Sequence, residues 1–248
     1  MTDPVVARLA AAGCVAPAEE AAELLHDAPD AGELEARLQR REAGEPLEWI
    51  TSRVVFGGVA LHVERGVYVP RRQTEELARR AAALLPERGV AVDLCTGSGA
   101  VAAWLQHAVP ASFVVGVERD PASARCAARN GVPVVVGDLA ESLHALASVD
   151  VVTAVAPYVP TAARALLPSD VQRHEPRRAH DGGDDGLAVV RRVVEHAGVL
   201  LRPGGHLLLE LGGDQDQALA PDLARHGLDT VTAWYDDDGD LRGLCAGR

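Results

Sequence analysis

Residues 92–100 read Val92-Asp-Leu-Cys-Thr-Gly-Ser-Gly-Ala100, an apolar run that ends in a glycine-rich turn. The pattern predicts a buried strand at residues 90–94 and a helix at residues 98–107. Gly97 and Gly99 lack the Cβ atoms that would hold a ligand away from the backbone. The helix behind them begins with N–H groups that have no intrahelical partner. This order predicts a ligand site at the carboxyl edge of a parallel sheet.

Strand and helix patterns alternate around this stretch. Six further strands are expected at residues 113–117, 133–136, 150–154, 206–211, 230–235 and 241–246. Helices are expected at residues 73–85, 121–130, 185–200 and 214–226. The alternation predicts an α/β fold with a seven-stranded, doubly wound sheet. The last two strands are joined by a short acidic turn, so they are expected to pair antiparallel.

The N-terminal part has a different pattern. Residues 1–45 carry prolines near the starts of short apolar-striped segments, which predicts a helical segment. Residues 46–72 are expected to form a linker with a β-hairpin turning at Gly57-Gly58. The main domain is expected to span residues 73–248.

Composition narrows the class of protein. The net charge of −12 argues against nucleic-acid binding, because an acidic surface repels phosphates. Four scattered cysteines without a C-x-x-C pair fit reduced thiols in a cytoplasmic protein. We expect no membrane span, because the chain has no apolar run of about 18 residues. No leader with a basic start and an apolar run is visible.

Acidic side chains after successive strands indicate which ligand the glycine turn holds. Glu118 ends the strand at 113–117, 25 positions after Asp93, and is expected to bind ribose hydroxyls. Asp138 follows the next strand and suits the amine of adenine, with Leu139 against the ring. These acids favour an adenosine site, which the glycine pattern alone does not, since nicotinamide-binding folds share it. The chain has no lysine, so a dehydrogenase Tyr-x-x-x-Lys pair is absent.

Four more segments occur in a fixed order with the glycine turn. They are Gly44-Glu-Pro-Leu-Glu-Trp-Ile50, Phe56-Gly-Gly-Val-Ala-Leu61, Val69-Pro-Arg-Arg-Gln-Thr-Glu75 and His174-Glu-Pro-Arg-Arg-Ala-His-Asp-Gly-Gly-Asp-Asp-Gly-Leu187. Together they resemble the HemK/PrmC family of protein-(glutamine-N5) methyltransferases. The third is similar to that family's Pro-Arg-Pro-x-Thr-Glu signature, and the fourth to its Glu-Pro-x-x-Ala-Leu-x-Gly-Gly-x-x-Gly loop.

The resemblance implies a Rossmann-like methyltransferase fold and S-adenosyl-L-methionine as the cofactor, with S-adenosyl-L-homocysteine as the product. The residues then expected to bind the cofactor are Asp93, Cys95, Thr96, Gly97, Gly99, Glu118, Arg119, Asp138 and Leu139.

Two features depart from the family. Its catalytic Asn-Pro-Pro-Tyr stands here as Val155-Ala156-Pro157-Tyr158, the expected catalytic segment, and the N-terminal helical segment is shorter. In the family, the Asn oxygen and the next backbone carbonyl accept the two N–H groups of the substrate amide, and the Tyr ring packs against it. Val155 cannot accept a hydrogen bond. The Ala156 carbonyl and the Tyr158 ring remain available.

Four residues are expected to bind substrate: Arg71, Thr74, His174 and Glu175. His174 or His180 could also serve as a general base. These histidines lie near acidic residues in the sequence, as the ligands of a metal site can. The family loop has no histidines at these positions, so no metal is expected.

These observations predict a methyltransferase that uses S-adenosylmethionine and methylates a nitrogen, or less readily an oxygen, of a small molecule in specialised metabolism. The first alternative is a protein-(glutamine-N5) methyltransferase acting on a release factor or another protein. The second is a cofactor-binding protein that has lost catalysis. The identity of the acceptor and the oligomeric state stay open at this point.

Overall fold

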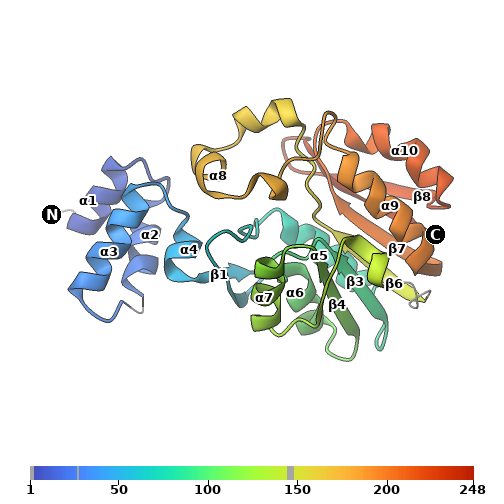
Figure 1. Cartoon of the computed structure of the whole chain (residues 1–248), viewed down its shortest axis with the longest axis horizontal. Coiled ribbons are helices and arrows are strands. Elements are labelled where there is room, and N and C mark those ends of the chain that lie inside the picture. Colours follow the sequence, from blue (N-terminus) through green and yellow to red (C-terminus); the bar gives the residue numbers. More distant parts are fainter. Residues whose placement is uncertain (1–2, 27, 144–147) are drawn as a thin grey trace.

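The computed structural model describes residues 3–26, 28–143 and 148–248 (Figure 1). The N-terminal helices α1 (Pro4–Ala11), α2 (Pro17–Leu25) and α3 (Ala31–Glu42) lie together at one end of the molecule. The Asp3 and Asp30 side chains cap α1 and α3 by accepting backbone N–H groups. A small apolar cluster, which includes the buried Leu9, Leu24 and Leu38, holds the helices together. The predicted helical segment is therefore confirmed over the described residues.

The linker differs from its prediction in one element. The hairpin of β1 (Arg53–Phe56) and β2 (Val59–His62) is present and antiparallel, as predicted. A short helix that the sequence did not predict, α4 (Leu47–Thr51), precedes the hairpin. Trp49 is buried beside Val63 and Val69, and its Nε1–H donates to the carbonyl of Val67 at 3.0 Å. Long-range packing of Trp49 thus stabilises a helix too short to be visible in the sequence.

The main sheet has seven strands in the order β5-β4-β3-β6-β7-β9-β8. The strands are β3 (Val90–Leu94), β4 (Phe113–Glu118), β5 (Val134–Val136), β6 (Val149–Ala154), β7 (Leu201–Glu210), β8 (Thr230–Tyr235) and β9 (Leu241–Gly247). Strands β3 to β7 pair in parallel, and β9 pairs antiparallel with both β7 and β8. The predicted α/β fold class and the antiparallel last pair are confirmed.

Helices cover both faces of this sheet (Figure 1). One face packs against α5 (Thr74–Leu84), α6 (Ala100–Ala108) and α7 (Pro121–Arg129). The other packs against α9 (Ala188–Leu200) and α10 (Gln215–Arg225). Ala91 of β3 belongs to the first cluster and Val92 to the second, because side chains alternate along a strand. The sheet is therefore doubly wound.

Several boundaries differ from the predicted ones. The helix expected from residue 185 begins at Ala188, and the strand expected from residue 206 begins at Leu201. The strand extends because Pro203-Gly204-Gly205 is accommodated by a register shift between Val149 and Val151 of β6.

The connection from β6 to α9 contains helical turns that the sequence did not predict: η2 (Thr161–Leu166), α8 (Ser169–His174) and η3 (Arg177–Ala179). In the view of Figure 1 it lies between the N-terminal helices and the α9–α10 pair. A further 3₁₀ turn, η1 (Leu139–Ser142), follows β5. No helix in the described part of the chain is both long and apolar enough to cross a membrane.

Candidate functional site

The turn after β3 is built around left-handed backbone. Gly97 and Gly99 have φ values of 56° and 81°. A Cβ on Gly99 would lie 3.0 Å from side-chain carbons of Ala127 and Val132, so this glycine allows α6 to pack against the next unit. Gly97 has no atom within 4 Å of its Cβ position, which leaves open space above the turn. The turn is thus tightly packed at Gly99 and open at Gly97.

Asp93 supports the turn from below. It is buried, and it accepts hydrogen bonds from the hydroxyls of Thr96 at 2.5 Å and Thr153 at 2.7 Å. Burial raises its pKa to about 6 from the ordinary 3.8, because a carboxylate loses hydration in the interior. The role of Asp93 is therefore to hold the turn in place.

Glu118 lies at the carboxyl end of β4 and binds backbone on two sides. Its two carboxylate oxygens accept the N–H groups of Gly97 and Asp120, each at 2.9 Å. The carboxylate thus ties the glycine turn to the start of α7 and keeps remaining lone pairs for a ligand.

Asp138 follows β5 and is paired with a residue far away in the sequence. Arg192 of α9 lies 3.0 Å from its carboxylate and 3.4 Å from that of Glu141. The pairing holds the pKa of Arg192 above its ordinary value, chiefly through the hydrogen bond to Asp138. Sequence reasoning missed Arg192, because nothing in its local pattern marks an arginine on α9 as part of this site.

These groups surround a cavity of about 190 Å³, here called the cofactor cavity. Eight of the nine residues expected to bind cofactor line it: Asp93, Cys95, Thr96, Gly97, Glu118, Arg119, Asp138 and Leu139. Gly99 does not line the cavity and acts through packing. Open space over a glycine turn, with carboxylates at the ends of two successive strands, fits the adenosine part of S-adenosylmethionine.

A second cavity of about 560 Å³ adjoins the first and is here called the acceptor cavity. The two cavities share Tyr68, Val155 and Ala179 in their walls. Val155 is half-buried directly after β6, whereas Ala156 and Tyr158 line the acceptor cavity alone. Tyr68 was not singled out from the sequence, although it stands immediately before the Val69-Pro70 segment that was.

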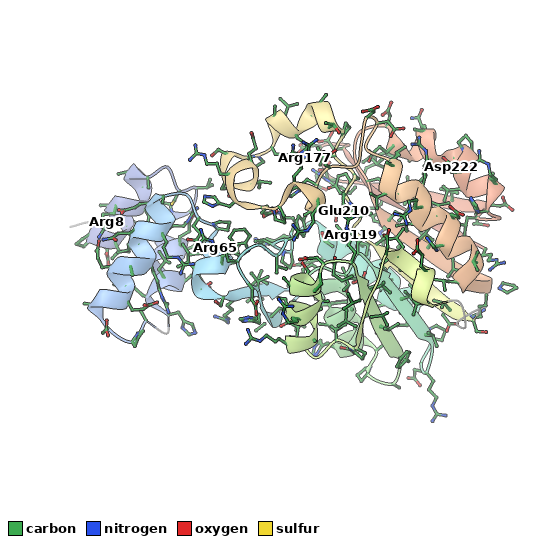
Figure 2. All side chains as sticks on the ribbon, in the orientation of Figure 1. Arg8, Arg65, Arg119, Arg177, Glu210 and Asp222 are labelled. Carbon is green, nitrogen blue, oxygen red and sulfur yellow. The ribbon has the colours of Figure 1, made fainter. Side chains whose placement is uncertain are left out.

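A buried carboxylate fixes Tyr158. Its hydroxyl donates to Glu210 at 2.9 Å and accepts from the Gln73 amide at 3.2 Å. Glu210 also accepts from Thr74 at 2.6 Å and from Gln73 at 2.8 Å. Burial raises the pKa of Tyr158, so it remains a neutral phenol. Figure 2 shows Glu210 near the middle of the molecule, close to Arg119 in that view. Thr74 therefore positions Tyr158, although it also borders the cofactor cavity.

Two glycines of the β6–α9 connection pack against the segment 155–158, which was expected to be catalytic. A Cβ on Gly182 would lie 2.6 Å from the Pro157 carbonyl, and one on Gly186 would lie 2.2 Å from the Tyr158 carbonyl. The Gln215 side chain donates to this Tyr158 carbonyl at 2.8 Å. The backbone of the segment is thus held by contacts in which only glycine fits.

Arg71 and Glu175 meet behind Tyr68. Arg71 forms an ion pair with the buried Glu175, and its guanidinium lies 5.1 Å from the centre of the Tyr68 ring. His180 lies 2.9 Å from the second oxygen of Glu175, and its ring meets the Tyr68 ring edge-on at 5.5 Å. Arg71 and His180 line the acceptor cavity, and Glu175 supports them from behind.

His174 is placed elsewhere. Its ring lies edge-on to Trp49 at 6.4 Å, and it lines neither cavity. Trp49 is buried and packed rather than available for stacking. No group of three or more histidines, cysteines and acids that could hold a metal occurs among the described residues.

The β6–α9 connection also covers the cofactor cavity. Pro176, Arg178 and Asp181 contribute to its wall, and Arg178 pairs with Asp120 of the opposite wall at 2.9 Å. Asp120 is also the N-cap of α7. This pair joins the β6–α9 connection, which contributes to both cavities, to the strand-end region that lines the cofactor cavity.

Known proteins resemble this chain both in sequence and in structure. No protein-family model matches it. A release factor glutamine methyltransferase of Moorella thermoacetica is 40% identical over 205 residues, covering 79% of this chain and 71% of that protein. A 4-amino-L-phenylalanine/4-methylamino-L-phenylalanine methyltransferase of Streptomyces pristinaespiralis is 39% identical over 190 residues, covering 72% and 65%. Further bacterial relatives, 34–39% identical, are also release factor glutamine methyltransferases.

Among solved structures, the 16S rRNA N2 G1207 methyltransferase of T. thermophilus matches with a TM-score of 0.53 at 19% identity. The match covers 79% of this chain and 44% of that one. At this identity the likeness shows the fold alone, which is that of the Rossmann-like methyltransferases.

Proposed function

The chain belongs to the HemK/PrmC family of release factor glutamine methyltransferases, and we propose that it methylates the side-chain amide nitrogen of a glutamine in a protein. That the chain is a methyltransferase follows from its relatives, and its family and fold imply S-adenosylmethionine as the donor. The relatives support a protein acceptor better than the small-molecule acceptor that was the first expectation from the sequence.

The residues of the cofactor cavity suit this donor. Glu118 would accept hydrogen bonds from the ribose hydroxyls. Asp138 would accept one from the adenine amine, either while it keeps its ion pair with Arg192 or after that pair has separated. When bound, S-adenosylmethionine supplies a methyl carbon that is already electrophilic, because it is attached to a positively charged sulfur. The protein therefore has to align a nucleophile rather than activate the methyl group.

The observation that carries the proposal is the catalytic segment at the junction of the two cavities. The Ala156 carbonyl receives no hydrogen bond from any residue that the structure describes, so it is free to accept one N–H of the acceptor. The Tyr158 ring, fixed by Glu210, offers a planar face for an amide. A carbonyl dipole aimed at the nitrogen stabilises the positive charge that develops there during transfer.

Val155 favours a second candidate acceptor. An amide nitrogen is a poor nucleophile, because its lone pair is delocalised into the carbonyl. Val155 supplies no side-chain acceptor at this position. An aromatic amine needs less help of this kind, and one relative methylates 4-amino-L-phenylalanine. An aromatic amine on an amino acid is therefore the second candidate.

Methyl transfer to both acceptors tests the proposal. The protein is incubated with S-adenosylmethionine and either a bacterial release factor or 4-amino-L-phenylalanine, and the products are analysed by mass spectrometry. A release factor whose modified glutamine is replaced by alanine serves as the control. One methyl group gained on that glutamine supports the protein acceptor. Methylation of the amine alone would replace it with the second candidate, and no transfer to either would refute both.

A further inference from the structure

The acceptor cavity is cationic on an acidic protein. The chain carries a net charge of −12, yet three arginines line this cavity, Arg71, Arg72 and Arg242. Among the described residues, Asp170 is the single carboxylate in the same wall. A cationic cavity in a protein of opposite net charge indicates a ligand with a negative group.

Two of the three arginines are neutralised inside the protein. Arg71 pairs with Glu175, and the guanidinium of Arg242 binds Asp236, with Nε at 2.8 Å. Arg72 forms no ion pair with any residue that the structure describes, Asp170 included. It is exposed at the edge of the cavity, two residues before α5 begins at Thr74. The free positive charge of the acceptor cavity is therefore that of Arg72.

The differences from the quoted family motifs gather at the same place. Arg72 stands at the third position of the Pro-Arg-Pro-x-Thr-Glu signature, and Val155 and Ala156 stand at the Asn and the first Pro of Asn-Pro-Pro-Tyr. His180 stands at the Leu of the glycine loop. All four line the acceptor cavity, and of these only Val155 also borders the cofactor cavity. The changes therefore concern what is methylated rather than what donates the methyl group.

We propose that Arg72 is a specificity residue that binds a carboxylate carried by the methyl acceptor. This rests on the proposed methyl transfer to nitrogen and adds the chemical class of the acceptor: a planar nitrogen with a carboxylate within reach of the cavity edge. The carboxylate comes either from the acceptor itself, when it is a free amino acid, or from an acidic side chain near the glutamine of a protein.

A purely structural role for Arg72 has no support in its contacts. It donates no side-chain hydrogen bond to a described residue, whereas Arg71 beside it holds Glu175 and Tyr68 in place. Replacing Arg72 should therefore leave folding unchanged. Arg79 provides a matched control, since it is exposed on the adjoining helix α5 and pairs with Glu76 outside both cavities.

Binding measurements test the proposal without requiring turnover. The protein is saturated with S-adenosylhomocysteine, and affinities are measured by calorimetry for two pairs of probes. One pair is 4-amino-L-phenylalanine and its carboxamide. The other is a glutamine peptide with and without an aspartate beside the glutamine. In the pair that matches the true acceptor, the carboxylate form should bind about fivefold more tightly, the size expected of an exposed ion pair.

Arg72→Gln should remove this ratio, Arg72→Lys should retain part of it, and Arg79→Gln should leave it unchanged. Raising the salt concentration should bring the parent ratio toward one, because salt screens an exposed ion pair. The pair that shows the ratio identifies the source of the carboxylate. The inference is overturned if neither pair shows it, or if Arg72→Gln leaves it intact. If the parent protein shows the affinity ratio but transfers no methyl group to either acceptor, the proposed reaction is refuted and the carboxylate site is not.

Discussion

The cofactor cavity and the acceptor cavity are made in different ways. The cofactor cavity is formed mainly by the carboxyl ends of β3, β4 and β5. The acceptor cavity is formed by residues drawn from the segments 68–73, 155–159, 167–171 and 179–180, with Arg242. Strand ends are fixed by the sheet, whereas connections tolerate substitution. The expected cofactor residues are in place at the first cavity, while the family motifs are altered at the second. The departures from the family motifs therefore lie on the side of the acceptor cavity rather than at the strand ends of the cofactor cavity.

The largest effect should come from Glu118→Ala at the cofactor cavity. Two charge-assisted hydrogen bonds to ribose would be lost, together with the acceptors for Gly97 and Asp120. The affinity for S-adenosylmethionine should fall roughly 1000-fold. Calorimetry measures this, with Glu141→Ala as the control at an exposed carboxylate nearby. Equal affinity in the parent and the Glu118→Ala protein would contradict the expected role of Glu118 in binding the cofactor.

The next effect concerns the stability of the cofactor turn. The pKa of buried Asp93 is about 6 in the folded protein, against 3.8 for an exposed Asp. Because the folded-state pKa is raised, the native state binds the proton more tightly than the unfolded state. The stabilisation is full below about pH 4 and is lost as the pH rises through 6, a decrease of about 3 kcal/mol.

Asp93→Asn should abolish this part of the pH dependence. Urea unfolding at several values between pH 4 and pH 7 compares the variant with the parent, and Asp214→Asn controls for an exposed carboxylate. If the difference in unfolding free energy between the parent and the Asp93→Asn protein is flat over this range, the buried carboxylate has no raised pKa.

A smaller effect is expected at the acceptor cavity from Val155→Asn. The new amide oxygen would accept an N–H of a substrate amide, and it would lie unpaired beside a less polar acceptor. The preference for glutamine amide over aromatic amine, taken as the ratio of kcat/KM values, should rise roughly 100-fold. Val155→Ala, which adds no polar group, should not raise it. A lower melting temperature with unchanged kinetic constants would indicate that Val155 only packs under the strand end.

The smallest effect tests the link between the two cavities. Arg178→Gln removes the 2.9 Å ion pair with Asp120. The Arg178 side chain is 46% exposed and the Asp120 side chain is 20% exposed. Exposed pairs contribute little, so S-adenosylhomocysteine should dissociate only about threefold faster. Stopped-flow release measures this, with Arg177→Gln as the control, because Arg177 pairs within its own loop. A change above tenfold would mean that the loop, rather than the strand ends, retains the cofactor.

The sequence by itself determined the sheet, its antiparallel last pair and the expected cofactor residues. Hydrophobic runs, glycine turns and strand-end acids are local signals, and parallel strands bring their carboxyl ends to one edge in any doubly wound sheet. Residues on separate strands and turns, such as Gly97, Glu118 and Asp138, could therefore be expected to line one cavity from local patterns alone.

Only the tertiary structure decided the partners that come from distant segments. Arg192 meets Asp138 across 54 positions, and Glu210 meets Thr74 across 136. The tertiary structure also places His174 outside both cavities, against Trp49, and places Tyr68 in the walls of both. The position of His174 depends on how the β6–α9 connection folds over the sheet. A loop without a hydrophobic period gives no local signal of its path, so the contacts that position it are decided by packing alone.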